Sequence, residues 1–436
     1  MKTVSARIFS LTLPWVLPAA QACALVPVFL PFRGCPVRCV FCAQDVQTGS
    51  VSAACPAEAV SGTAFAPRTG TAPAAAAGRA SLPLPLPPLP VQPLDVLLHE
   101  TRGNLERRHT LGLPPAELAF YGGTFTAMPD GDQAACLDLA GLALERGWIR
   151  SFRCSTRPDC VTAPVLERLR AAGCRCVELG VQSFSDAALA ASSRGYDGAT
   201  ALRACAHVKD AGLALGVQLL PGMPGHAPAD FLADVPQALR AGADMLRFYP
   251  CLVLEGTALA RMWRQGTYSP WPLEATLDLL AQGWLMAQAA HVPVIRMGLA
   301  PEAALDGAVL AGPVDRSLGS RVMGRALLLA VRRAVEAAGE TSGASCVPVL
   351  SELRLPGACQ GYIWGTRGEL RPVWAGLGLE PKNARFDAVC GQALFLTLTC
   401  SGLQVAPGGS GPFGFRPDTV GASFLHFYAG SLAAPF

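Results

Sequence analysis

The chain has 436 residues, of which 51% are hydrophobic, 15% charged and 7% aromatic. A chain this long and this apolar can bury one large core or two ordinary ones, which excludes a peptide, a disulfide-stapled miniprotein and a disordered protein. The formal net charge of +3 neither requires nor forbids a nucleic-acid partner, because binding depends on a local basic patch. The 16 cysteines are not needed as a disulfide framework, because the apolar content suffices for a core.

The first uncharged stretch of the chain has two interpretations. Residues 8–32 contain no charged side chain and follow two basic residues, which is typical of a secretory signal peptide with Ala20-Gln21-Ala22 as a small-residue cleavage site. Four prolines in the stretch disfavour a membrane-spanning helix, because each interrupts the helical hydrogen-bond ladder. The other interpretation is a buried strand at residues 25–32 (LVPVFLPF) that leads directly into a functional loop.

Short apolar runs then alternate with helical patterns. The predicted strands are Val26–Phe32, Glu117–Tyr121, Phe152–Thr156, Cys176–Gln182, Leu213–Leu220, Met245–Tyr249 and Val292–Met297. The predicted helices between them are Asp132–Glu145, Ala163–Ala172, Thr200–Ala211, Ala229–Ala241 and Leu273–Ala289. This alternation predicts an α/β fold with a parallel sheet, and six or seven units in about 270 residues indicate a partial or complete TIM-like (β/α) barrel.

Three segments of different character are expected along the chain. Residues 25–300 form the barrel, and residues 48–93 within it are a low-complexity insertion whose Ala-, Pro-, Ser- and Gly-rich composition cannot pack a core. Residues 1–24 are an N-terminal extension, and residues 301–436 are a small, partly irregular C-terminal extension. Functional residues are therefore expected in the barrel, in the loops that follow its strands.

Three cysteines follow the first predicted strand, in the segment GCPVRCVFC. Cys35, Cys39 and Cys42 are spaced so that their thiolates can converge on one metal centre. Three thiolates suit a 4Fe–4S cluster with one open iron, whereas a structural zinc ion requires a fourth ligand, and no second CxxC or CxH segment stands nearby. The alternative is three incidental cysteines in a cysteine-rich chain.

This cysteine loop resembles that of the radical S-adenosylmethionine (SAM) superfamily. The resemblance implies that Cys35, Cys39 and Cys42 hold a 4Fe–4S cluster, that Phe41 covers the cofactor, and that the open iron chelates SAM. It also implies a reductant protein of flavodoxin or ferredoxin type, whose electron cleaves SAM to a 5′-deoxyadenosyl radical. The expected fold is then a barrel of radical SAM type.

The resemblance also bears on the first uncharged stretch. A cluster enzyme of this kind requires a reducing compartment, which favours a cytoplasmic protein without a membrane segment. LVPVFLPF is then the first strand of the barrel. Whether residues 1–20 belong to the mature chain stays open, as does the oligomeric state.

Further motifs follow the predicted strands: YGGTFTAMP, STRPDC, ELGVQS, an Arg-Gly pair, QLLPGMPG and RFYPCLVLEGTAL. In this order they resemble the radical SAM domain of the Elongator catalytic subunit and its shorter bacterial relatives. The resemblance implies that SAM is bound by Gly122, Gly123, Thr124, Arg157, Gln182 and Gln218. On the residues alone, Arg157 could instead form a loop salt bridge with Asp159, and Gln218 could be a core glutamine with satisfied hydrogen bonds.

Three residues at later strand ends are candidate substrate ligands. Arg247 and Arg296 could bind substrate anions or extend to solvent, and Tyr249 could line the pocket or fill the core. The resemblance implies the wobble uridine of tRNA as the substrate. The sequence itself adds a cluster of arginines in Arg102–His109, a pattern that is also typical of a solvated helix face.

Two other functions stay open: SAM chemistry on a small metabolite, and a cluster-bearing binding or regulatory protein that does not turn SAM over. The Elongator subunit carries an acetyltransferase domain, but residues 301–436 are few for such a domain and its linkers. The segment GYIWGTRGEL also lacks the acetyl-CoA-binding spacing of that domain. Acetyltransferase activity is therefore not expected. Nor is an auxiliary cluster, because the cysteines of the C-terminal extension lack cluster-like spacing.

Overall fold

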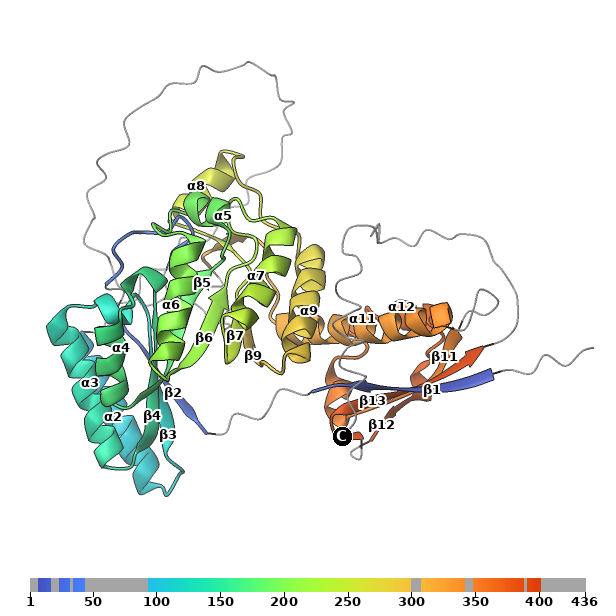
Figure 1. The fold of residues 1–436 in the computed structure, drawn as a ribbon, viewed down its shortest axis with the longest axis horizontal. Coiled ribbons are helices and arrows are strands. Elements are labelled where there is room, and N and C mark those ends of the chain that lie inside the picture. Colours follow the sequence, from blue (N-terminus) through green and yellow to red (C-terminus); the bar gives the residue numbers. More distant parts are fainter. Residues whose placement is uncertain are drawn as a thin grey trace, which may run out of the picture.

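The computed structural model describes residues 7–16, 23–31, 34–43, 93–298, 307–341, 348–387 and 390–400. The insertion predicted at residues 48–93 lies outside these ranges except for Pro93. Within them the chain forms a seven-stranded sheet, a four-stranded sheet and a two-stranded ribbon, and helices pack against the two larger sheets (Figure 1).

The seven-stranded sheet is parallel throughout. Its strands pair in the order β2, β3, β4, β5, β6, β7 and β9. Their bounds are Leu25–Phe29 (β2), Ala116–Tyr121 (β3), Ile149–Thr156 (β4), Cys174–Gln182 (β5), Ala214–Leu219 (β6), Met245–Phe248 (β7) and Val294–Met297 (β9). Because β2 and β9 are edges of the curled sheet and do not pair with each other, the fold is a half-barrel, which confirms the predicted partial TIM-like barrel (Figure 1).

Six helices cover the outer face of this sheet (Figure 1). They are α2 (Leu94–Thr110), α3 (Asp130–Glu145), α4 (Ala163–Ala171), α6 (Gly198–Asp210), α7 (Pro228–Arg240) and α9 (Leu273–Ala289). Two shorter helices, α5 (Asp186–Ala191) and α8 (Ala258–Arg264), lie beyond the carboxyl ends of the strands. This arrangement covers one face of the sheet and leaves the inner face for polar side chains.

Helix α6 shows how the sequence produces these elements. Its N-cap residue Asp197 accepts a hydrogen bond from the amide of Thr200 at 2.8 Å, which satisfies one of the free donors of the first turn. Just past the helix, Gly212 has a φ of +70°, a conformation that ends helices at little cost only in glycine. The buried side chains recur at helical spacing and face the sheet: Ala201, Ala204, Cys205 and Val208.

The predicted elements of the half-barrel are present in the predicted order. Each of the seven observed strands overlaps its predicted range, and Leu25–Phe29 is confirmed as the first strand. The five predicted helices correspond to α3, α4, α6, α7 and α9, with ends that differ by at most two residues. The prediction assigned no range to α2, α5 or α8, or to any element beyond β9.

The smaller sheet joins segments from the two ends of the described chain. Its strand order is β1 (Arg7–Pro14), β13 (Ala393–Cys400), β11 (Pro348–Leu355) and β12 (Ala384–Phe386). Strand β1 is antiparallel to β13 along its full length, from Arg7 opposite Cys400 to Pro14 opposite Ala393. Helices α11 (Leu318–Thr341) and α12 (Arg371–Gly376) lie on one face of this sheet (Figure 1).

Short elements complete the described fold. The two-stranded ribbon pairs β8 (Val253–Leu254) with β10 (Val309–Ala311). The 3-10 turns are η1 (Phe125–Ala127), η2 (Pro158–Cys160), η3 (Gly357–Gly361), η4 (Thr366–Gly368) and η5 (Pro381–Asn383). Of the helices in the described ranges, none combines the length and apolar character that a bilayer crossing requires.

Helix α11 packs along α9 and connects the half-barrel to the smaller sheet. Two arginines of α11 make ion pairs across this junction. Arg321 lies 2.9 Å from Glu274 of α9 and 2.6 Å from Glu369, and Arg325 also pairs with Glu274. The junction is therefore polar at its rim, and each arginine has a carboxylate within reach.

The segment after β1 also crosses this junction. The Trp15 ring lies 5.0 Å from the ring of Trp284 in α9, centroid to centroid. Its indole Nε1 donates a hydrogen bond to Tyr362 Oη at 3.1 Å. Trp15 is 3% exposed, so it joins the core of the half-barrel to the core under the smaller sheet.

Candidate functional site

The residues predicted to bind a cofactor lie where the parallel strands end. Each group follows a different strand, and the carboxyl ends of parallel strands meet at one edge of a sheet. The cysteine loop follows β2, Gly122 to Thr124 follow β3, Arg157 follows β4, Gln182 ends β5 and Gln218 lies near the end of β6. The structure therefore brings these predicted residues to one end of the half-barrel.

The cysteine loop approaches the loop after β3 very closely. Gly34, which precedes Cys35, has a φ of +80°, and a Cβ atom placed on it would lie 2.5 Å from the Thr124 carbonyl oxygen. Only glycine combines this conformation with so close an approach. The start of the cysteine loop is therefore fixed against the backbone of the neighbouring loop.

The two glycines after β3 also have positive φ values, +106° for Gly122 and +59° for Gly123. A Cβ atom on Gly122 would lie 2.4 Å from the carbonyl oxygen of Leu30, which follows β2. The backbone packing therefore requires glycine at position 122, whether or not a ligand is bound. That requirement places the β3 loop directly beside the segment that enters the cysteine loop.

Cys35 contacts this loop through its side chain. Its Sγ lies 3.0 Å from Thr124 Oγ1, within hydrogen-bond distance. Burial raises the pKa of the Cys35 thiol, and the Thr124 hydrogen bond and the charge of Arg157 oppose that rise. Thr124 is itself fully buried, so the contact is shielded from water.

The Cys39 thiol faces two buried guanidinium groups. Its Sγ lies 3.1 Å from Nη1 of Arg194 and 3.6 Å from Nη1 of Arg157. All three side chains are nearly inaccessible to solvent, with exposed fractions of 7% or less. Cysteine binds metals as the thiolate, and two guanidinium groups at these distances can offset the negative charge of a thiolate-bound metal centre.

Arg194 is a site residue that the sequence prediction did not select. Burial would lower the pKa of its guanidinium, but Tyr196 and Cys39 raise that pKa overall, so the group stays charged. Nη2 of Arg194 also donates to the Gly180 carbonyl oxygen of β5 at 2.5 Å and to Tyr196 Oη at 2.6 Å. The sequence signal that could have identified Arg194 is the Arg-Gly pair after ELGVQS.

Arg157 makes the salt bridge that the sequence left as an alternative to cofactor binding. Its guanidinium donates to both carboxylate oxygens of Asp159, at 2.9 and 2.8 Å. Nη2 also donates to the Arg194 carbonyl oxygen at 2.5 Å. The salt bridge therefore orients Arg157 so that its remaining nitrogen, Nη1, faces Cys39.

The donor set of the loop fits a 4Fe–4S cluster. No three His, Cys, Asp or Glu side chains in the described ranges stand close enough together to hold a metal ion directly. Cys39 and Cys42 nevertheless share one turn, in which the Cys42 amide donates to the Cys39 carbonyl oxygen at 3.1 Å. Three thiols on one loop beside two guanidinium groups supply the ligands and the compensating charge that such a cluster uses.

Phe41 packs against a small apolar cluster beyond the strand ends. The members of this cluster include Leu189 of α5, Met223 of the loop after β6 and Leu259 of α8. The Leu259 amide donates to the Val40 carbonyl oxygen at 2.8 Å, which holds the loop to α8. Phe41 is half-buried, so part of its ring remains accessible.

The two predicted glutamines are neighbours on the inner face of the half-barrel. Nε2 of Gln218 donates to Oε1 of Gln182 at 3.5 Å. Gln182 has a φ of +69° and is 6% exposed. A left-handed conformation in a long-chain residue is uncommon and is concentrated at functional sites.

Next to the glutamines, the inner face carries a network of charged side chains, of which the sequence prediction selected only Arg247. Arg153 of β4 lies 2.5 Å from Glu117 of β3 and 3.2 Å from Glu178 of β5. Glu178 also pairs with Arg247 of β7 at 2.8 Å and accepts from Tyr121 Oη at 3.1 Å. Two carboxylates thus balance two guanidinium groups in a nearly closed interior.

The three predicted substrate ligands lie on this inner face, toward β9. Nη1 of Arg247 donates to Tyr249 Oη at 3.0 Å. Arg247 is the register partner of Arg296 on β9, so both side chains point to the same side of the sheet. Nε of Arg296 donates to the Gly298 carbonyl oxygen at 3.2 Å.

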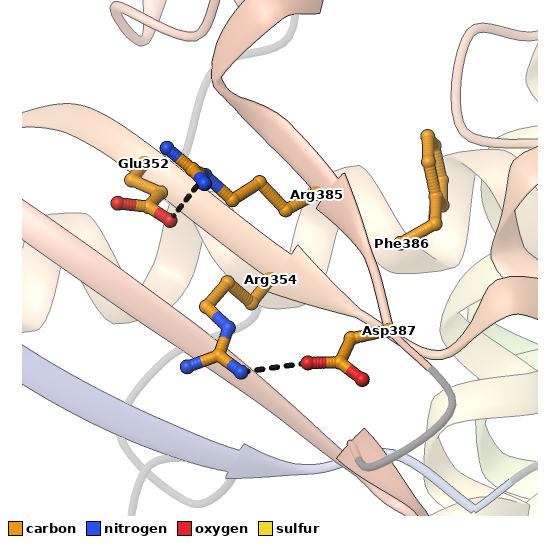
Figure 2. A pocket seen from close by; sticks show the side chains of 5 residues that line it. All are labelled: Glu352, Arg354, Arg385, Phe386 and Asp387. Carbon is orange, nitrogen blue, oxygen red and sulfur yellow. Dashed lines mark hydrogen bonds and ion pairs between the residues drawn. The ribbon is translucent and has the colours of Figure 1, made fainter.

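Two other charged features lie away from this site. The arginines of Arg102–His109 lie in α2, whose last residue shortly precedes the start of β3, so they belong to the opposite end of the half-barrel. An open hollow of about 510 Å³ on the smaller sheet is lined by Glu352, Arg354, Arg385, Phe386 and Asp387 (Figure 2). There Arg354 pairs with Asp387 and Arg385 with Glu352, so the hollow has no excess of either charge.

Two family models together match most of the residues of the half-barrel. A model of the Radical SAM superfamily matches residues 90–235, and a model of the Radical_SAM C-terminal domain matches residues 243–324. The first match begins after the cysteine loop. The assignment of Cys35, Cys39 and Cys42 therefore rests on the loop itself.

The chain spans less than half of the length of the curated relatives that it matches. The tRNA uridine(34) acetyltransferase of Methanocaldococcus infernus is 30% identical over 204 residues, which are 42% of this chain and 38% of that protein. Elongator complex protein 3 of Saccharomyces cerevisiae is 26% identical over 205 residues, 42% of this chain and 37% of that protein. A solved structure of Elp3 from M. infernus, which lacks residues 1–46, is 25% identical to this chain and superposes with a TM-score of 0.45. The match covers 56% of this chain and 59% of the chain in that structure.

Proposed function

Because the chain belongs to the radical SAM superfamily, we propose that it is a radical SAM enzyme in which Cys35, Cys39 and Cys42 hold a 4Fe–4S cluster. The observation that carries the proposal is the environment of Cys39, whose thiol faces the buried Arg157 and Arg194. Asp159 offsets the charge of Arg157, but among the described residues no carboxylate pairs with Arg194, so negative charge that accumulates at Cys39 would be compensated there. A cluster ligated by three thiolates provides that charge.

The cluster, when bound, supplies the electron for reductive cleavage of SAM. The task of the chain's own residues is to hold SAM and exclude water. We assign SAM binding to Gly122, Gly123, Thr124, Gln182 and Gln218, with Phe41 as a cover. Arg157 and Arg194 complete this set, because both point into the same buried space.

A uridine of tRNA is the proposed substrate. The support is the likeness to the M. infernus tRNA uridine(34) acetyltransferase, together with the order of motifs that resembles the Elongator family. Arg247, Tyr249 and Arg296 are the proposed substrate ligands, because they line the inner face beyond Gln218. An electron donor of flavodoxin or ferredoxin type and a reducing, cytoplasmic environment follow from the proposed cluster.

The test is anaerobic reconstitution of the full-length chain with iron and sulfide, followed by addition of SAM and reductant with or without total tRNA. We expect 5′-deoxyadenosine to form and its yield to rise with tRNA. Mass spectrometry of the digested tRNA should show a modified uridine that is absent when SAM is omitted.

Two results would overturn different parts of this proposal. If no 5′-deoxyadenosine forms with or without tRNA, the chain is not a radical SAM enzyme of the proposed kind. If 5′-deoxyadenosine forms but neither its yield nor the uridines respond to tRNA, the proposed substrate is wrong and a small metabolite takes its place.

A further inference from the structure

Three arginines lie on the inner face of the half-barrel. Arg153 lies on β4, Arg247 on β7 and Arg296 on β9. The first two belong to the network with Glu117 and Glu178, and each has a carboxylate within 3 Å. Their positive charges are therefore offset within the protein itself.

Arg296 differs from the other two. Among the described residues no carboxylate lies within 4.0 Å of its guanidinium, and its one hydrogen bond, from Nε to the Gly298 carbonyl oxygen, leaves Nη1 and Nη2 without a protein partner. The side chain is half-buried, so water does not fully solvate it. Among the described residues of the inner face, the positive charge without a nearby carboxylate therefore lies at the β9 edge, on Arg296.

The position of Arg296 relative to the proposed cofactor residues is also defined. Gln218 is the register partner of Arg247, and Arg247 is the register partner of Arg296. Gln182, which contacts Gln218, lies one strand further toward the cysteine loop. A row of side chains therefore leads from the SAM site to Arg296, and a substrate on this row would place one end at each.

We infer that Arg296 binds a phosphate group of the substrate, so that a nucleotide lies on the inner face with its phosphate at the β9 edge and its reacting part toward Gln218. This inference rests on the proposed function and specifies the substrate class as phosphate-bearing. Two free guanidinium nitrogens in one plane match the oxygens of a phosphate and can bind it in a bidentate manner. Arg247 cannot take this role without giving up Glu178.

The test uses the reconstituted full-length protein and two probes, uridine 3′,5′-bisphosphate and uridine, with binding measured by anaerobic calorimetry. Arg296→Gln should weaken binding of the bisphosphate about ten- to hundredfold, the range for loss of a charged hydrogen-bonded pair. Binding of uridine should not change. Arg296→Lys, which keeps the charge but not the planar fork, should give an intermediate affinity for the bisphosphate.

Arg150→Gln is the matched control, because Arg150 is an exposed arginine near the opposite end of β4. It should leave the affinity for the bisphosphate unchanged. Equal affinities of wild type and Arg296→Gln would overturn the inference, as would a wild-type protein that does not bind the bisphosphate. Neither result would affect the proposed function, which the 5′-deoxyadenosine and tRNA assays decide separately.

Discussion

At the scale of single residues, Glu178 organises the inner face. One of its carboxylate oxygens accepts from Arg153, Arg247 and Tyr121, and the other lies 2.8 Å from Nε of Arg247. Burial and the charge of Glu178 both raise the pKa of the Tyr121 hydroxyl, so Tyr121 remains a hydrogen-bond donor at neutral pH. The orientation of Arg247 therefore depends on one carboxylate.

Replacing Glu178 with glutamine should leave two buried guanidinium groups without full compensation. We expect Glu178→Gln to lower the free energy of unfolding by about 3 kcal/mol, as measured by urea denaturation. The control is Glu255→Gln, which breaks an ion pair with Arg264 whose side chains are about half exposed. That variant should lose less than about 1 kcal/mol, and equal losses in the two variants would contradict a special role for Glu178.

The sequence alone predicts the residues of the candidate site that lie within one loop, but not those that are brought together from different strands. Cys35, Cys39 and Cys42 could be predicted as ligands because their spacing within one loop lets three thiolates converge on one metal centre. Glu117, Arg153 and Glu178 lie on three different strands, and their pairing depends on strand register. Register shifts between β3 and β4 and between β4 and β5 decide which side chains meet, and no local pattern encodes such shifts.

At the scale of elements, close contacts between loops fix the site. Gly34, Gly122 and Gly195 all have positive φ values, and a side chain on each would press on a neighbouring loop. Gly195 faces the side chain of Val37 in the cysteine loop. The loops after β2, β3 and α5 are thus packed on one another, which is how parallel strands hold a constellation of residues in place.

Gly122→Ala tests this packing. The new Cβ would meet the Leu30 carbonyl oxygen, and alanine disfavours a φ of +106°, so we expect a loss of at least about 2 kcal/mol in the free energy of unfolding. Gly141→Ala is the control, because Gly141 lies inside α3 with open space around it. That variant should gain roughly 0.5–1 kcal/mol. Similar effects of the two substitutions on the thermal midpoint would contradict the packing described here.

Elements were predictable where their signals are local. Helices α3, α4, α6, α7 and α9 of the half-barrel show buried positions at helical spacing. The strands between them are short apolar runs, many of them next to a glycine. Strand β1 pairs with β13, which lies at the far end of the described chain, and a local pattern cannot reveal so distant a partner. Residues 7–14 were therefore interpreted as an extension, although they supply one strand of the smaller sheet.

At the scale of the whole molecule, Trp15 links the half-barrel to the smaller sheet through Trp284 and Tyr362. Trp15→Ala should lower the free energy of unfolding by about 3–5 kcal/mol, because it leaves a cavity in a dense core. Trp263→Ala is the control, since Trp263 on α8 is 36% exposed. It should change stability by less than about 1 kcal/mol, and an equally small effect of Trp15→Ala would show that the two parts do not depend on each other.

The cysteine loop is proposed to hold an iron–sulfur cluster. The most direct test is the iron content of the anaerobically reconstituted chain, compared between Cys39→Ala and Cys23→Ser, a half-buried cysteine that precedes the loop. Wild type and Cys23→Ser should bind about four iron atoms per chain, and Cys39→Ala should bind almost none. Wild-type iron content in Cys39→Ala would contradict the account.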